Sequence, residues 1–340
     1  MFTAERLQAI VDKRVCRMNL WNISPTWTGW QSRMISALAA QPVETDDDRD
    51  VALARARDIP RYIDTEISNL RRGLESGYVA PASNVAAVLT QIESLAETPV
   101  EESPFYSPAA RAGDKEFAAD YKKVIDSAVT PALLRYRDFL ADSYQGRDLI
   151  GVAGNPDGAA CYEASIRYYS SLRMSAEDIH RAGLTQMSRI HAEMLAIAKE
   201  HFGTSDLQAL FNELRSNPEY TFESEEDMLD YVNAAVARAE TAMGDWFLNV
   251  PPSRLIVYPA PAYEKDSGGG FYSSGADPNE LVGYYKVGTW NPAGISKAGT
   301  EATAFHESWP GHHLDNIITL SNESLHEIQK YTYIAGMGEG

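Results

Sequence analysis

The chain has 340 residues, enough for one large domain or two, and 44% of them are hydrophobic, which is ample for a substantial core. Its formal net charge of -18 at pH 7 argues against nucleic acid and anionic membranes as partners, because both require clustered cations. Cys16 and Cys161 lie so far apart in the sequence that they predict neither a disulfide framework nor a thiolate metal site.

The start of the chain bears on its location. Residues 1–6 are polar and lack the apolar core of a signal peptide. No apolar run in the sequence approaches the length that a helix needs to cross a bilayer. The sequence therefore predicts a cytoplasmic protein.

Two helical regions are expected first, residues 1–150 and 151–250. In the first region, apolar residues recur at helical spacing and predict helices over 44–77, 83–97 and 108–144, with a loop over 98–108 and a kink at Pro131. In the second region, Ser175 opens a capping box before one long helix, and a further amphipathic helix is expected over 221–248.

The composition changes in the third region, residues 251–340. Short runs rich in β-branched and aromatic residues predict strands over 254–258, 271–272 and 284–289. A helix is expected over 296–309, followed by a second one over 314–333. The fold class predicted for the whole chain is therefore mainly α, with a small β-sheet next to the helix of residues 296–309.

That helix carries the chain's most informative motif. Residues 306–313 read His-Glu-Ser-Trp-Pro-Gly-His-His and contain three of the seven histidines. A histidine followed by glutamate, with further histidine nearby, is typical of zinc hydrolases. In such sites the imidazoles hold the ion and the carboxylate takes a proton from water that the metal activates. The motif predicts His306 as a zinc ligand and Glu307 as the general base.

The second histidine ligand depends on how the chain passes Pro310. In His-Glu-x-x-His motifs the ligands lie four residues apart on one helical face, but the residue four after His306 is Pro310. A kink or widened turn at Pro310 and Gly311 would bring His312 to that place. His313 stays the alternative, because on a straight helix it would lie on the same face about 10 Å away.

The motif resembles the His-Glu-x-x-Pro-Gly-His-His signature of a bacterial family, domain of unknown function 885. The likeness extends upstream through residues 162–202 and 263–292, and so covers about the last half of the chain. The resemblance implies a zincin-like metallopeptidase fold built of long helices, with zinc as the cofactor and a peptide as the substrate.

The resemblance also implies a third ligand. The family carries a Glu-Gly-Trp-Ala motif on a later helix, and Glu339 and Gly340 match its first two residues. Glu339 is thus the expected third ligand, delivered by the return of the chain after the motif. Family members continue beyond this point, so the C-terminal part of the catalytic domain is expected to lie beyond Gly340.

Three functions remain open at this stage. The first is a zinc peptidase, in which residues 283–289 form the edge strand that pairs with the substrate backbone; the alternative for that strand is an ordinary sheet capping the helices. The second is a catalytically silent helical module that binds peptides or proteins. The third is a zinc amidohydrolase acting on a non-peptide metabolite. The oligomeric state is not predicted.

Overall fold

The computed structural model describes residues 2–260, 270–275 and 281–339. The chain is mainly helical with a small three-stranded sheet, as predicted. It packs as two compact units, one formed by Ile10–Ser165 and the other by Met1–Ala9 with Ile166–Gly340. The regions expected at 151–250 and 251–340 therefore share one unit for nearly all their length. Among the described residues, no helix is both long enough and apolar enough to span a membrane.

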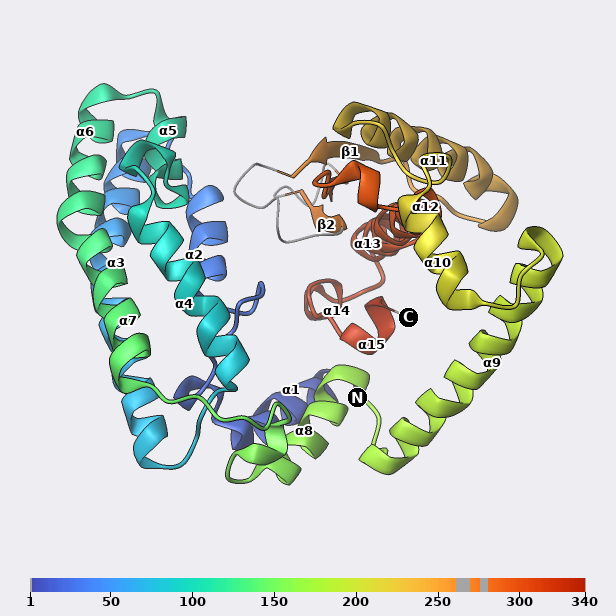
Figure 1. Ribbon diagram of the computed structural model, residues 1–340. Helices are drawn as coiled ribbons and strands as arrows, with labels where there is room; N and C mark the ends of the chain where they lie inside the picture. The colour runs from blue at the N-terminus through green and yellow to red at the C-terminus, as the bar shows by residue number, and fades with distance from the viewer. Residues whose placement is uncertain (1, 261–269, 276–280, 340) are drawn as a thin grey trace. The chain divides into compact units, whose positions relative to one another are not determined.

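The unit Ile10–Ser165 is built of helices around one apolar core. Its helices are α2 (Trp30–Ala39), α3 (Asp46–Glu75), α4 (Ala82–Glu97), α5 (Ser107–Ala112), α6 (Lys115–Val124) and α7 (Thr130–Ser143). α7 packs against α3 and α4, and α3 also contacts α6 (Figure 1). Ile63 of α3, Ile92 of α4 and Leu133 of α7 meet in this core with almost no exposed surface.

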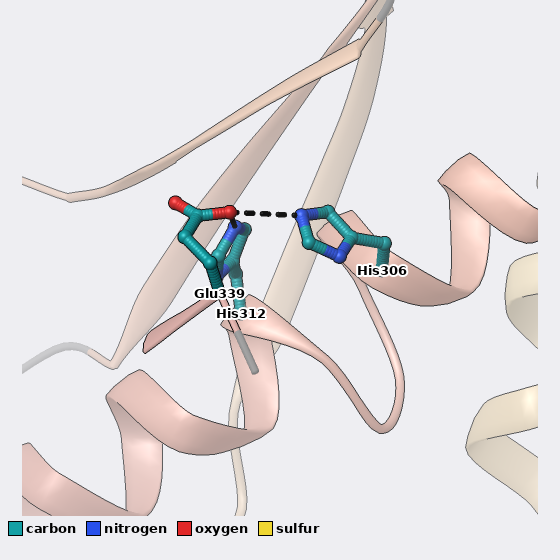
Figure 2. Close-up of side chains that lie close together, drawn as sticks. All are labelled: His306, His312 and Glu339. Carbon is teal, nitrogen blue, oxygen red and sulfur yellow. Dashed lines mark ion pairs between the residues drawn. The ribbon is translucent and has the colours of Figure 1, made fainter. Parts of the chain in front are cut away.

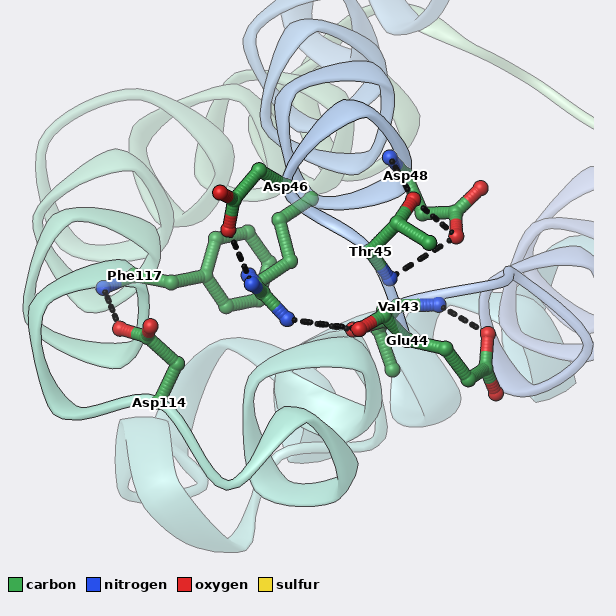
Figure 3. Close-up of polar contacts among 8 residues, drawn as sticks. Val43, Glu44, Thr45, Asp46, Asp48, Asp114 and Phe117 are labelled. Atoms are coloured by element: carbon green, nitrogen blue, oxygen red, sulfur yellow. Dashed lines mark hydrogen bonds and ion pairs between the residues drawn. The ribbon is translucent and has the colours of Figure 1, made fainter.

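The start of α3 shows how local sequence sets a helix boundary. Thr45 accepts a hydrogen bond from the Asp48 backbone N–H, and the Asp48 carboxylate accepts one from the Thr45 N–H, which completes a capping box (Figure 3). In the same view, Asp114 accepts a hydrogen bond from the Phe117 N–H at the start of α6. These side chains satisfy N–H groups that have no partner within the helix.

The single helix predicted over 108–144 was wrong. The chain leaves the helical conformation at Gly113, which has φ +65°, and Asp114 then caps a new helix, α6. A π-helical segment, Ile125–Val129, joins α6 to α7. Pro131 is the second residue of α7, directly after this π-helical segment.

Cys16 and Cys161 form a disulfide, although their distance in the sequence did not predict one. The fold brings their Cα atoms to 4.6 Å, within the range that a disulfide requires. Cys161 lies in α8 (Gly158–Ser170), so the bond fixes the start of this helix to the short turn Lys13–Cys16. Sequence separation was a poor guide because folding, not spacing, decides which thiols meet.

The second unit joins long helices to the sheet and to the short helices at the chain's end. Its N-terminal helix α1 (Phe2–Asp12) is held to α8 by the ion pair of Glu5 with Arg167. The remaining helices are α9 (Ala176–Phe202), α10 (Leu207–Ser216), α11 (Glu225–Trp246), α12 (Lys297–Glu307), α13 (His312–Ser321), α14 (Glu327–Lys330) and α15 (Ala335–Gly338).

The sheet has three strands, β1 (Arg254–Pro259), β2 (Gly270–Ser274) and β3 (Val282–Val287), in the order β1-β3-β2. β3 pairs in parallel with β1 and antiparallel with β2. The prediction that residues 283–289 form an edge strand was therefore wrong, because β3 is hydrogen-bonded on both sides. Within the part of the chain that the structure describes, β1 and β2 are the edge strands.

One face of the sheet supports the helices that carry the motif. Alternate residues of β3 are buried, as expected for a strand with one face against a core, and these include Tyr285 and Val287. They pack in one apolar cluster with Ala304 of α12 and Leu314 of α13. β2 contacts both α12 and α13, so this edge strand runs beside the motif.

Candidate metal centre

The motif lies at a break between two helices. α12 ends at Glu307 and α13 begins at His312, so the chain leaves the helical conformation at Ser308 and does not merely kink or widen at Pro310. Pro310 has no N–H to donate, and the Gly311 N–H reaches back to the carbonyl oxygen of Phe305 at 3.1 Å. The intervening turn therefore folds against the end of α12.

This break brings two imidazoles together. His306 lies in the last turn of α12 and His312 at the first position of α13, and their ring centroids are 4.5 Å apart. The Nε2 atoms of both rings approach the same carboxylate oxygen, Oε2 of Glu339, at 3.4 Å for His306 and 3.7 Å for His312 (Figure 2). Within the described parts of the chain, these three side chains form the group whose ligand atoms could hold one ion, all within 4.8 Å of one another.

Glu339 reaches this position through a series of short elements. The single helix predicted over 314–333 was wrong, because α13 ends at Ser321 and Asn322 adopts an extended conformation. α14 and α15 follow, each of four residues, and Glu339 comes directly after α15. The second oxygen of Glu339, Oε1, accepts a hydrogen bond from the hydroxyl of Tyr333.

Glu307 is a buried residue whose carboxylate interacts electrostatically with His306, His312 and Glu339. Its side chain is only 7% exposed, and burial raises the pKa of its carboxyl group above the usual value. The nearby His312 and His306 rings and a hydrogen bond from the Tyr272 backbone N–H act in the opposite direction on the same pKa. The carboxylate is thus held next to both imidazoles by the edge strand β2.

His313 is not part of the group formed by His306, His312 and Glu339. It has no exposed surface, its Nε2 lies 3.1 Å from Ser253 Oγ, and its Nδ1 lies 3.3 Å from the Tyr272 hydroxyl. The Trp309 ring packs edge-on against it at 4.6 Å between centroids. Burial lowers the pKa of His313 to about 4, so the ring is neutral at pH 7. Of the two histidines left open by the sequence, His312 is the one beside His306.

Two contributors were missed in the sequence. Tyr272 contacts His313 through its hydroxyl and Glu307 through its backbone, and Tyr333 binds Glu339. Neither tyrosine belongs to a spaced motif, and the chain has 18 tyrosines, so no signal in the sequence singled them out.

The donor set fits a zinc ion. Bonds of about 2.0 to 2.1 Å in tetrahedral geometry place the ligand atoms of one zinc ion about 3.3 Å apart. The separations of 3.4 and 3.7 Å from Glu339 Oε2 to the two imidazole nitrogens are close to that value. Two neutral imidazoles and one carboxylate are also a common ligand set in catalytic zinc sites.

Comparisons with known proteins identify a family for the chain and a solved structure with a similar fold. No curated protein shows significant similarity to the chain. The fold is similar to a solved structure titled "The crystal structure of the putative lipoprotein from Colwellia psychrerythraea", with a TM-score of 0.77 at 18% sequence identity. The match covers 86% of this chain and 53% of that one, so the chain spans about half the length of this relative. A family model described as "Bacterial protein of unknown function (DUF885)" matches residues 2–340, and the chain therefore belongs to the DUF885 family.

Proposed function

We propose that this protein is a zinc-dependent peptidase of the zincin-like kind. The single observation that carries the proposal is the convergence of His306, His312 and Glu339 from three separate elements on one point, with the buried Glu307 next to it. A ligand set beside a general base is what metal-assisted hydrolysis requires.

Each residue of the site has a separate role in the proposed hydrolysis. His306, His312 and Glu339 hold zinc, which when bound supplies Lewis acidity to the scissile carbonyl group. Glu307 accepts a proton from the attacking water and passes it to the leaving amine. The hydrogen bond from the Tyr272 N–H orients the Glu307 carboxylate for this transfer.

The edge strand β2 supports a peptide as the substrate. Among the described residues, β2 is hydrogen-bonded to a strand on one side only, to β3, and its Tyr272 N–H is directed to Glu307. An extended peptide laid along β2 would run beside Glu307 and His312 and would add a strand to the sheet. β2 replaces residues 283–289 in this role, because β3 has no free edge.

Metal content and catalysis are tested separately. We expect about one zinc per chain by elemental analysis, and loss of that zinc in His306→Ala and in His312→Ala. His191→Ala, which removes an exposed histidine of α9, should keep it and serves as the control. A wild-type protein that binds no zinc would refute the ligand assignment.

The role of Glu307 is tested by Glu307→Gln. This variant should keep zinc and lose at least a hundredfold in peptide hydrolysis, because general-base catalysis contributes that much. Glu323→Gln changes an exposed carboxylate and should have no effect. Digestion of a peptide library by the wild-type protein then separates three outcomes. Cleavage supports the peptidase, zinc without any cleavage supports the silent binding module, and hydrolysis of non-peptide amides alone supports the amidohydrolase.

The disulfide supports a proposal on location. Disulfides persist in oxidising compartments and are rare in the cytosol. The bond between Cys16 and Cys161 therefore favours a compartment outside the cytoplasm over the cytoplasmic location expected from the sequence. Thiol labelling of the protein in intact cells, with and without reductant, tests this assignment.

A further inference from the structure

Tyr333 lies outside the motif and donates a hydrogen bond to Glu339, one of the three proposed ligands. The carboxylate of Glu339 has its two oxygens in different environments. Oε2 faces the two imidazoles at 3.4 and 3.7 Å, whereas Oε1 accepts the hydrogen bond from the Tyr333 hydroxyl. One oxygen is thus directed to the ion position, and the other is held by the phenol.

The backbone between Tyr333 and Glu339 passes close to the phenol ring of Tyr333. Tyr333 precedes α15 and Glu339 follows it, so the ring must cross this short helix to reach the carboxylate. It crosses at Gly338, where an added Cβ atom would lie 2.3 Å from the ring carbon Cε2 and 2.9 Å from the hydroxyl oxygen. Only glycine at residue 338 leaves room for the ring in this position.

Glu339 is the most exposed of the three proposed ligands. Its side chain is 54% exposed, whereas that of His306 is 45% exposed and that of His312 is 15% exposed. α15 has only four residues and no side-chain N-cap, so it does little to restrict the carboxylate. A glutamate that is free to rotate loses side-chain entropy when it binds an ion, and this loss weakens binding. A hydrogen bond that holds the carboxylate beforehand removes part of that cost.

We propose that Tyr333 is a positioning residue for the metal, which fixes Glu339 so that one carboxylate oxygen points at the ion held by His306 and His312. The inference rests on the proposed metal site and extends it to a partner that the family motif does not contain. Hydrogen-bond partners of metal ligands are worth about 10-fold to 100-fold in metal affinity.

The test is a competition titration of zinc against a chromophoric chelator, with the whole chain. Tyr333→Phe removes only the hydroxyl group, and we expect it to weaken zinc binding about 10-fold to 100-fold. Tyr331→Phe is the matched control, because Tyr331 lies two residues earlier and is 60% exposed. Its affinity should equal that of the wild type.

A double-mutant cycle separates positioning from a general effect on the fold. In a Glu339→Ala background, Tyr333→Phe should cause no further loss of affinity, because the carboxylate that it orients is gone. The absorption spectrum of bound Co²⁺ gives a second reading, since a misplaced carboxylate changes the metal's ligand field.

The possible failures are distinguishable. A wild-type chain that binds no metal would refute the metal site itself. A wild-type chain that binds zinc, with Tyr333→Phe binding equally well, would refute only the role of Tyr333. Equal losses with and without Glu339 would also overturn that role, because they would show that the hydroxyl acts elsewhere.

Discussion

Gly311 lies so close to His306 that a Cβ atom added to it would be 1.9 Å from the His306 carbonyl oxygen. The contact joins the end of α12 to the residue just before α13. His306 is one partner of this contact, and His312 directly follows the other partner, Gly311. The contact therefore sets the distance between the two imidazoles. The glycine of the motif is needed for this close approach of two backbones, and not for flexibility.

Replacement of Gly311 by alanine should damage both the fold and the site. The backbone must move away from His306, and we expect a loss of about 1 to 3 kcal/mol in the free energy of unfolding, typical of overpacking. Zinc affinity should fall as well, because His312 moves with residue 311. Urea unfolding and a zinc titration measure the two effects.

The matched control is Gly183→Ala in α9, where an added Cβ atom meets nothing within 4 Å. Alanine is the better helix former, so this variant should gain about 0.5 to 1 kcal/mol. If Gly311→Ala behaved like Gly183→Ala, the contact with His306 would have no structural role.

Glu301 should anchor the helix α12 in a pH-dependent way. It lies on α12 and accepts hydrogen bonds from Tyr231 at 2.6 Å and from Arg238 at 2.5 Å, both on α11. These contacts lower the pKa of Glu301 below its usual value of 4.5, with the Tyr231 bond as the largest cause. Since the folded state favours the carboxylate, this contribution is complete above pH 4.5 and disappears as the pH falls through the lowered pKa.

Glu301→Gln tests this anchor. At pH 7 it should lower the free energy of unfolding by about 1 to 3 kcal/mol, as expected for hydrogen bonds to a charged group. The difference from the wild type should shrink below pH 4.5. Unfolding curves at several pH values measure it, with Glu323→Gln as the exposed control. A difference that is constant from pH 7 to pH 3 would contradict the assigned cause.

His313 should make the metal-free protein sensitive to mild acid. Its pKa is about 4 in the folded state and near 6.5 in the unfolded state, so the unfolded chain binds the extra proton between these values. Stability must therefore fall as the pH falls through this window, by about 2 kcal/mol between pH 7 and pH 5. Urea unfolding in the presence of a chelator measures the change.

The comparison is with His313→Gln, which has no titrating ring. This variant is expected to be less stable at pH 7, because it loses the packing against Trp309, but its stability should change less between pH 7 and pH 5. Equal pH slopes for the two proteins would show that His313 does not remain neutral when buried.

Reduction of the disulfide should destabilise the unit Ile10–Ser165. The bond between Cys16 and Cys161 closes a loop with a sequence separation of 145 residues. In the chain-entropy account, a loop of that length stabilises the folded state by about 5 kcal/mol. Dithiothreitol should lower the melting temperature of the wild type and leave that of a Cys16→Ser, Cys161→Ser double variant unchanged. A wild-type melting temperature that does not respond to reductant would rule out a stabilising bond.

The sequence by itself determined the elements that depend on local chemistry. The helix that begins after Thr45, the helix start at Ser175 and the strands around Ile256 and Tyr285 were all predicted, because caps and apolar periodicity act over a few residues. The motif likewise identified His306 and Glu307 as the residues to examine, since their chemistry is evident from residue type and spacing, and the family resemblance added Glu339.

Only the tertiary structure decided between His312 and His313. The two are neighbours in the sequence, but successive residues of a helix point about 100° apart, so at the start of α13 one faces His306 and the other enters the core beneath β3. The pairing of Cys16 with Cys161, the central position of β3 and the contact of Tyr333 with Glu339 were decided in the same way. Each depends on contacts between separate elements, and residue spacing does not report which elements will meet.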